Sequence, residues 1–208
     1  MKFVVISDTH GQHAGLKLPK GDVLMHAGDI SSRGKRDEVL DFLNWFKELP
    51  HKYKIFIAGN HDFLFEDLPE EEIKAMIPDN VIYLCDSGVS IENIKIWGSP
   101  VTPWFFDWAF NRQRGTEIAK HWNLIPNDTD ILITHGPVFD KLDRTIHGER
   151  VGCIDLLKKV EHLRPKIFIC GHIHEAYGTQ EQNGIKYINA SVLDERYRLK
   201  NQPLVFEM

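Results

Sequence analysis

Five short apolar runs in this chain each lead into a polar segment that contains aspartate, asparagine or histidine. Runs of this length and composition are typical of strands buried on both faces of a sheet. Polar side chains beside a buried strand cost free energy unless they have partners. Because ligands bind beyond the carboxyl ends of strands in such sheets, we expect the five segments to form one site. They contain Asp8 and His10, Asp29, Asn60 to Asp62, His135, and His172 and His174.

Helical periodicity separates most of these strands. Apolar residues recur at helical spacing from Arg36 to Pro50 and from Ile154 to Leu163, and we expect further helices over 69–77 and about 112–122. Residues 81–99 contain three short strand patterns, which predict a hairpin or meander in a second sheet. This order favours an α/β (α+β layered) fold, in which two mixed sheets pack face to face with helices outside.

Length and charge limit the class of protein. At 208 residues, the chain is expected to form a single domain over 1–208. It has 30 acidic and 25 basic side chains, a net charge of −5, which disfavours long nucleic acids as partners. A small phosphate ester is not excluded, because bound cations can supply positive charge locally. Its three widely spaced cysteines predict neither a disulfide framework nor a thiolate metal site.

The N-terminal residues predict a strand rather than a signal peptide, and no apolar run has the length of a membrane span. We therefore expect a cytoplasmic protein with no membrane contact.

The polar segments contain more metal donors than one ion needs. A small divalent ion takes about four to six donors. Two ions that share a bridging carboxylate would use all of those present, and Asp29 is the natural bridge because it lies alone on its loop. Two ions about 3.5–4 Å apart can acidify a bridging water for in-line attack on phosphorus. The predicted donors are Asp8, His10, Asp29, Asn60, His135, His172 and His174.

His61 and Asp62 are the predicted catalytic residues. His61 follows the amide donor Asn60, and successive side chains of an extended segment point in opposite directions. We therefore expect His61 to face the leaving group, where an imidazolium contributes about 10²–10⁴ in rate. Asp62 is expected to orient His61 and keep it charged.

Other residues have simpler interpretations. His26 is expected to be a hydrogen-bonded core residue, while His147, on the polar loop after His135, is the remaining histidine best placed to touch substrate. The aromatic cluster over 104–110 is either core or lid packing, or a wall of the substrate pocket. The chain has no phosphate-binding glycine loop, dinucleotide fingerprint or nucleophile elbow, so a covalent serine or cysteine mechanism has no support.

Together the polar segments resemble the calcineurin-like metallophosphoesterase superfamily, in the same order and spacing. The resemblance implies a four-layer αββα sandwich and a binuclear centre of manganese, iron or zinc, of which we expect manganese. It also implies that Asp8, His10 and His174 hold one ion. Asn60, His135 and His172 would hold the other, with Asp29 bridging and His61 assisting the leaving group. The matching motifs are Asp8-Thr9-His10, Gly28-Asp29, Gly59-Asn60-His61-Asp62, Thr134-His135-Gly136 and Gly171-His172-Ile173-His174.

Two departures separate the chain from the protein phosphatases of that superfamily. The segment Gly28–Gly34 lacks their second aspartate, and Asp62 replaces a glutamate. The MPPED-like phosphodiesterase branch is more similar, which implies a metal-dependent phosphodiesterase acting on small nucleotides or cyclic nucleotides. A phosphomonoesterase or protein phosphatase is one alternative, and a non-catalytic scaffold is another. The residues that carry the closer resemblance are Trp45, Pro103-Trp104-Phe105, Gly152-Cys153 and Asn189-Ala190-Ser191.

Overall fold

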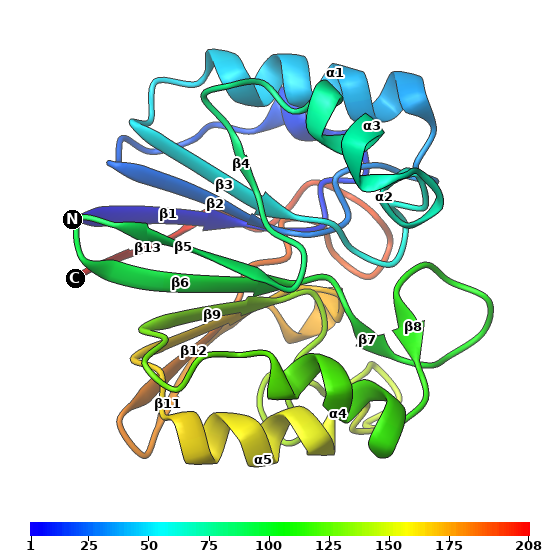
Figure 1. The fold of residues 1–208 in the computed structure, drawn as a ribbon, viewed down its shortest axis with the longest axis vertical. Coiled ribbons are helices and arrows are strands. Elements are labelled where there is room, and N and C mark those ends of the chain that lie inside the picture. The colour runs from blue at the N-terminus through cyan, green and yellow to red at the C-terminus, as the bar shows by residue number, and fades with distance from the viewer.

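A computed structural model describes all residues, 1–208. Two mixed sheets lie face to face, with helices on both outer surfaces (Figure 1). In the first sheet the outer C-terminal strand is antiparallel to its neighbour, and the other pairs are parallel. Its strands, in spatial order, are β13 (Leu204–Glu207), β1 (Lys2–Ile6), β2 (Val23–Ala27), β3 (Tyr53–Ile57) and β4 (Ile82–Tyr83).

The second sheet has four parallel central strands and an antiparallel strand at each edge. A separate two-stranded ribbon extends from it on the right of Figure 1 and consists of β7 (Thr102–Pro103) and β8 (Asn111–Arg112). The six strands, in spatial order, are β11 (Gly178–Gln182), β12 (Ile185–Asn189), β10 (Ile167–Cys170), β9 (Ile131–Thr134), β6 (Ile94–Ser99) and β5 (Ser87–Ile91).

The helices are amphipathic and cover the outer faces of the sheets. In α1, Val39, Phe42 and Phe46 lie one helical turn apart and are fully buried, so one side of the helix packs on the first sheet. None of the helices has the length and apolar character needed to cross a membrane. The helices are α1 (Arg36–Glu48), α2 (Leu64–Asp67), α3 (Glu70–Met76), α4 (Thr116–Asn123) and α5 (Ile154–Leu163), with 3₁₀ turns η1 (His13–Gly15) and η2 (His174–Ala176).

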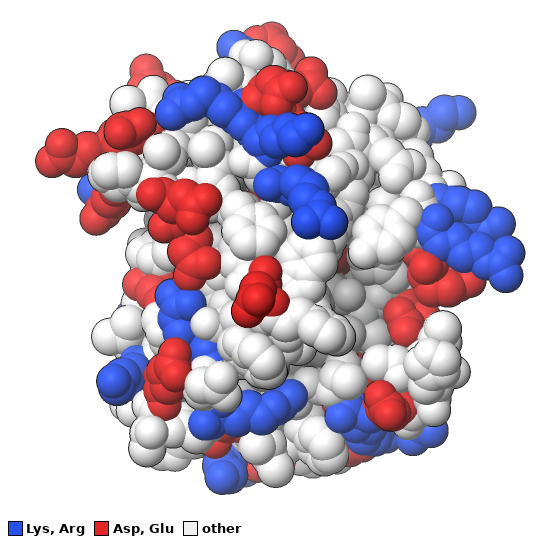
Figure 2. Space-filling model, turned by 90° about the vertical axis from the view of Figure 1, so that its right-hand side faces the viewer, with Lys and Arg blue, Asp and Glu red and all other residues white.

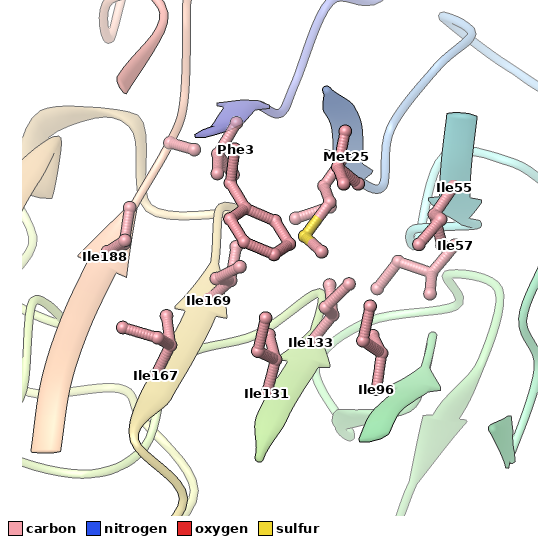
Figure 3. Close-up of a cluster of buried hydrophobic side chains, with 14 of the residues drawn as sticks. Phe3, Met25, Ile55, Ile57, Ile96, Ile131, Ile133, Ile167, Ile169 and Ile188 are labelled. Carbon is pink, nitrogen blue, oxygen red and sulfur yellow. The ribbon is translucent and has the colours of Figure 1, made fainter. Parts of the chain in front are cut away.

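The main core lies between the two sheets. Aliphatic side chains of β9 and β10 meet Phe3, Met25 and Ile55 from the opposite sheet (Figure 3). Branched side chains fit this surface because they pack well on a pleated sheet. Separate apolar clusters lie between each sheet and its helices. These layers confirm the α/β fold predicted from the sequence.

The interpretation of residues 81–99 was partly wrong. The segment β4 pairs in parallel with β3 and extends the first sheet, while β5 and β6 form the expected hairpin in the second sheet. The three patterns are similar locally, but the sheet that each strand joins depends on the partner available at its edge. The segment therefore crosses from one sheet to the other.

Candidate metal centre

All seven candidate metal donors lie at the carboxyl edge of the two sheets, on the right of Figure 1. Those from the first sheet follow β1, β2 and β3, and those from the second follow β9 and β10. One group consists of Asp8, His10 and His174, whose ligand atoms lie within 4.8 Å of one another. In another group, Asp29, His135 and His172 meet the same limit.

Asp29 lies between the two groups. Its Oδ2 atom is 3.6 Å from Nε2 of His10 and 3.3 Å from Nε2 of His135. Asn60 joins the second side, because its Oδ1 atom is 2.9 Å from Nε2 of His135. A carboxylate in this position can contact ions on both sides.

Backbone carbonyls orient two of the imidazoles. Nδ1 of His135 is 2.9 Å from the carbonyl oxygen of Ala27, and Nδ1 of His174 is 3.0 Å from that of Asp194. An N–H on Nδ1 that donates to a carbonyl leaves Nε2 as the ligand atom. Nε2 of His174 lies 3.5 Å from Oδ1 of Asp8, and Nε2 of His135 lies 3.3 Å from Oδ2 of Asp29. In both residues Nε2 therefore faces a carboxylate.

Asp8 is held by the backbone of one predicted donor, His172, and by Ser191, which the donor pattern did not single out as functional. The Ser191 hydroxyl donates to its Oδ2 atom at 2.7 Å, and the backbone N–H of His172 lies 3.0 Å from each of its carboxylate oxygens. The backbone N–H of Ser191 donates to Asn189 Oδ1 at 3.1 Å. The segment Asn189–Ser191 therefore fixes the Asp8 carboxylate from the second sheet.

The aspartates and histidines of the cluster shift one another's pKa values. Burial alone would lower the pKa of His135, but the charge and hydrogen bond of Asp29 raise that pKa to about 9. Asp8 similarly raises the pKa of His174 to about 9, against the effect of burial. Burial would raise the pKa of both aspartates, yet the neighbouring histidines hold each pKa below its usual range. Both carboxylates are therefore ionised at neutral pH.

His10 shows that the site suits a cation. Neither of its ring nitrogens has a hydrogen-bond partner, although both are buried. An unpaired buried imidazole costs free energy, and coordination to a metal would remove that cost. Carboxylate, imidazole and amide donors without sulfur suit divalent manganese, iron or zinc.

The backbone is strained at several of these positions. Asp8, His10, Asp29 and His172 have φ angles between 42° and 67°, in the left-handed region that residues other than glycine rarely adopt. Such conformations cost about 1–3 kcal/mol each and cluster at functional sites. Here they aim the side chains back across the sheet edge.

His61 is half-buried at the border of the cluster, where one of its ring nitrogens lies within 4.8 Å of ligand atoms of both His10 and Asp29. Its Nδ1 atom is 2.8 Å from the carbonyl oxygen of Ser32, and its ring centre is 4.2 Å from that of Trp108. The guanidinium of Arg33 lies over the ring of Trp108, 5.4 Å from the ring centre. These contacts fix the imidazole with Nε2 free.

The predicted pairing of Asp62 with His61 is wrong. The Asp62 carboxylate is fully buried and accepts hydrogen bonds from the backbone N–H groups of Gly59, Ile30 and Ser31 and from the Ser31 hydroxyl, at 2.6–3.1 Å. The chain turns after Gly59, and the Asp62 N–H donates to the Gly59 carbonyl. The Asp62 side chain therefore points towards the backbone of Ile30 and Ser31 and away from His61. Burial and the charge of Asp29 raise the pKa of Asp62 to about 6.

The histidines outside the donor set differ in environment. His26 is fully buried, with Nε2 3.0 Å from Thr9 Oγ1 and Nδ1 accepting from the Gly28 N–H at 3.2 Å, which confirms the predicted core role. Burial lowers its pKa to about 3. His147 is exposed and is absent from the groups around the candidate centre, so its contact with substrate stays a prediction.

Aromatic side chains surround the centre. Trp108 stacks on His61, Phe105 lies 5.1 Å from His172, and Tyr197 lies 5.0 Å from both His10 and His174. No motif or spacing indicated Tyr197, which reaches the site from a loop after β12 with a φ of 57°. The 104–110 segment therefore borders the candidate centre rather than lying wholly in the core.

The sequence profile of the Calcineurin-like phosphoesterase family matches residues 1–176. The chain belongs to this family. Calcineurin-like phosphoesterases are metal-dependent phosphoester hydrolases, and the metal-donor groups above accord with that chemistry. This phosphoesterase is 40% identical over 230 residues to Metallophosphoesterase domain-containing protein 1 of Homo sapiens and of Mus musculus. The alignment covers 100% of this chain and 71% of each relative, which confirms the resemblance to the MPPED-like branch.

Solved structures agree with the family's fold. The phosphopantetheinyl hydrolase of Mycobacterium tuberculosis superposes with a TM-score of 0.67, covering 94% of this chain and 90% of the other. The two sequences are 15% identical, so the similarity concerns the fold alone.

Proposed function

We propose that this phosphoesterase hydrolyses phosphodiester bonds of small nucleotides or cyclic nucleotides, using two divalent metal ions, manganese first among them. The position of Asp29 carries the proposal, because its carboxylate lies within 3.6 Å of one imidazole from each donor group. Both sheets supply donors, so residues 1–208 act as one domain. The absence of a sulfur donor and the unpaired nitrogens of His10 support a pair of oxygen- and nitrogen-ligated cations.

Each group of residues has a distinct task. Asp8, His10 and His174 would hold one ion, and Asn60, His135 and His172 the other, with Asp29 shared. Bound there, such ions acidify water and neutralise charge developing on phosphate oxygens. His61 donates through Nδ1 to the Ser32 carbonyl, which leaves Nε2 to give a proton to the departing oxygen. Asp62 holds the loops of Asp29 and His61 together.

The surroundings of the centre favour a small substrate. Phe105, Trp108 and Tyr197 narrow the approach to the donors. Figure 2 looks onto this face, whose hollowed central part is mostly uncharged, with most charged side chains towards its margins. A nucleic acid polymer instead requires a basic surface along its backbone.

Turnover of an activated diester tests this function. Manganese-loaded protein should bind about two ions per chain and hydrolyse bis(p-nitrophenyl) phosphate with a higher kcat/KM than p-nitrophenyl phosphate. Asp29→Asn and His61→Ala should each lower kcat by about 100-fold or more, because the first removes the shared carboxylate that would hold the ions and the second removes the proposed acid. Exposed Asp79→Asn and His162→Ala are matched controls and should keep the wild-type rate.

The outcomes separate the candidate activities. Unchanged turnover in both Asp29→Asn and His61→Ala would contradict the mechanism. A preference for the monoester would identify a phosphomonoesterase, and protein without stoichiometric metal or turnover would fit a scaffold.

A further inference from the structure

A cavity of about 360 Å³ opens beside the candidate metal centre. His172 belongs both to its lining and to the donor group of Asp29 and His135, so the cavity adjoins the centre at this residue. His61 does not line it. Its volume is within the range of about 300–1,000 Å³ that small-molecule sites have.

The exposed surface of the cavity is mostly apolar. One wall consists of Pro103, Trp104 and Phe105, and Pro137 and Val151 belong to the others. The Trp104 side chain is 51% exposed, so much of its ring is available for contact. Such a lining binds an uncharged, planar group best, through apolar burial and ring stacking.

The two arginines beside the cavity already have partners. Arg114 donates to the carbonyl oxygens of Gly152 and Val151 at 2.9 and 2.8 Å. Arg150 lies 2.7 Å from Asp140 and 2.8 Å from Asp143. Both guanidiniums are held by these partners, and the mostly apolar remainder of the lining favours an uncharged group over a second phosphate.

Hydrogen bonds hold the backbone of the loop that carries the aromatic wall. The backbone N–H of Trp104 donates to the Arg112 carbonyl at 2.8 Å, and the side-chain amide of Asn111 donates to the Phe105 carbonyl at 2.9 Å. The Ala109 N–H donates to the Asn60 carbonyl at 3.1 Å, which ties this loop to a candidate ligand. A backbone held in this way loses little entropy when a ligand binds.

We infer that this cavity binds the retained arm of the phosphodiester, and that this arm is an uncharged aromatic group such as a base or a phenyl ring. The inference rests on the proposed function. Water loses a proton to solvent as its oxygen bonds to phosphorus, the P–O bond to the leaving group breaks, and the leaving oxygen takes a proton from Nε2 of His61, which solvent then reprotonates. The arm that stays on phosphorus then lies on the other side of Asp29, next to His172.

Two diesters with the same leaving group test this inference. Phenyl p-nitrophenyl phosphate carries an aromatic retained arm, and methyl p-nitrophenyl phosphate a small one. Manganese-loaded Trp104→Ala should lower the ratio of kcat/KM for phenyl over methyl about 10-fold relative to wild type, mainly through KM. Comparing variants cancels the intrinsic reactivity of the two esters.

A second variant and a control distinguish a change in the cavity from misfolding of the protein. Val151→Phe fills the cavity from another wall and should lower the same ratio by a similar factor. Phe106→Ala removes a neighbouring ring that is 76% exposed and outside the cavity, and should leave the ratio unchanged. If Trp104→Ala and Val151→Phe lower both kcat/KM values equally, the inference is overturned while the proposed function stands.

Binding tests the cavity separately from turnover. If wild-type protein hydrolyses neither diester, the proposed function fails. Calorimetry with diphenyl and dimethyl phosphate then decides the inference. About 10-fold tighter binding of diphenyl phosphate, lost in Val151→Phe, would support the aromatic subsite. Equal affinity for the two would overturn it.

Discussion

Ser31 donates two hydrogen bonds to Asp62, one from its backbone N–H at 2.9 Å and one from its hydroxyl at 2.6 Å. Ser31 follows the loop of Asp29, and Asp62 follows His61. The pair therefore fixes the distance between the proposed bridging carboxylate and the proposed acid. Asp62 acts on His61 through the backbone and not by direct contact.

Removal of the Asp62 carboxylate should therefore weaken the fold. Asp62→Ala leaves buried N–H groups of Gly59, Ile30 and Ser31 without acceptors and should lower the free energy of unfolding by about 2–4 kcal/mol. Urea denaturation with a chelator present measures the loss. Asp67→Ala, at an exposed position of α2, is the matched control and should change stability by less than about 0.5 kcal/mol. Similar values for the two variants would contradict the role of Asp62.

Divalent metal should stabilise the protein through Asp29. A ligand that binds only the folded state adds about 2.7 kcal/mol at 100 times its Kd. The thermal midpoint of metal-free protein should rise as manganese is added and fall again with a chelator. Asp29→Asn should reduce this rise to less than half, whereas Asp79→Asn should keep it. A full rise in Asp29→Asn would mean that the ions bind elsewhere.

Gly28 should tolerate no side chain. It has a φ of 101°, and a Cβ atom there would lie 2.5 Å from His135 Nδ1 and 2.7 Å from the Ala58 carbonyl oxygen. Gly28→Ala should therefore cost about 2–4 kcal/mol of unfolding free energy, from overpacking together with backbone strain.

Gly115→Ala provides the comparison for this substitution. Its φ is 85°, but a Cβ atom meets nothing within 4 Å. It should cost less than Gly28→Ala, because only its backbone conformation, with φ 85° and ψ −130°, opposes a side chain there. Equal losses in urea titrations of the two variants would show that crowding by His135 is unimportant.

Stability should depend on pH through His26. Its pKa is about 3 in the folded protein, against 6.5 as the ordinary value, so the unfolded chain binds this proton first as pH falls. Its contribution is complete above pH 6.5 and is lost between pH 6.5 and 3, at about 1.4 kcal/mol per pH unit. Protonation of Nδ1 would break the bond from the Gly28 N–H.

The measurement compares wild-type protein with His26→Gln in chelator. Between pH 6.5 and 5 the wild type should lose about 2 kcal/mol more unfolding free energy than the variant. His162→Gln, on the exposed side of α5, should follow the wild type. Parallel curves for wild type and His26→Gln would refute this assignment.

Much of the fold follows from local patterns in the sequence. The apolar spacing after Arg36 predicts α1, and the observed helix ends at Glu48, before Pro50. The five buried strands and their polar ends were also visible, because burial on both faces demands continuous apolar runs. Their convergence follows from parallel pairing, as in the register of Ala27 with Ile57.

Other features depend on contacts that a local pattern does not contain. The side chain of Asp62 turns away from His61 because the chain bends at Gly59, and its partners come from the loop after β2. Tyr197 arrives from a loop far along the chain and packs by shape against His10. The sheet joined by β4 was likewise decided by the free edge of β3.

The spread of the candidate ligands along the chain bears on how the protein matures. Asp8 lies near the start, His174 comes 166 positions later, and Ser191 fixes Asp8 later still. Contacts of such long range form late and slowly during folding. A nascent chain therefore has no native-like ion site until both sheets have docked. Metal binding at the proposed centre would then come last and would stabilise only molecules whose two sheets have already docked.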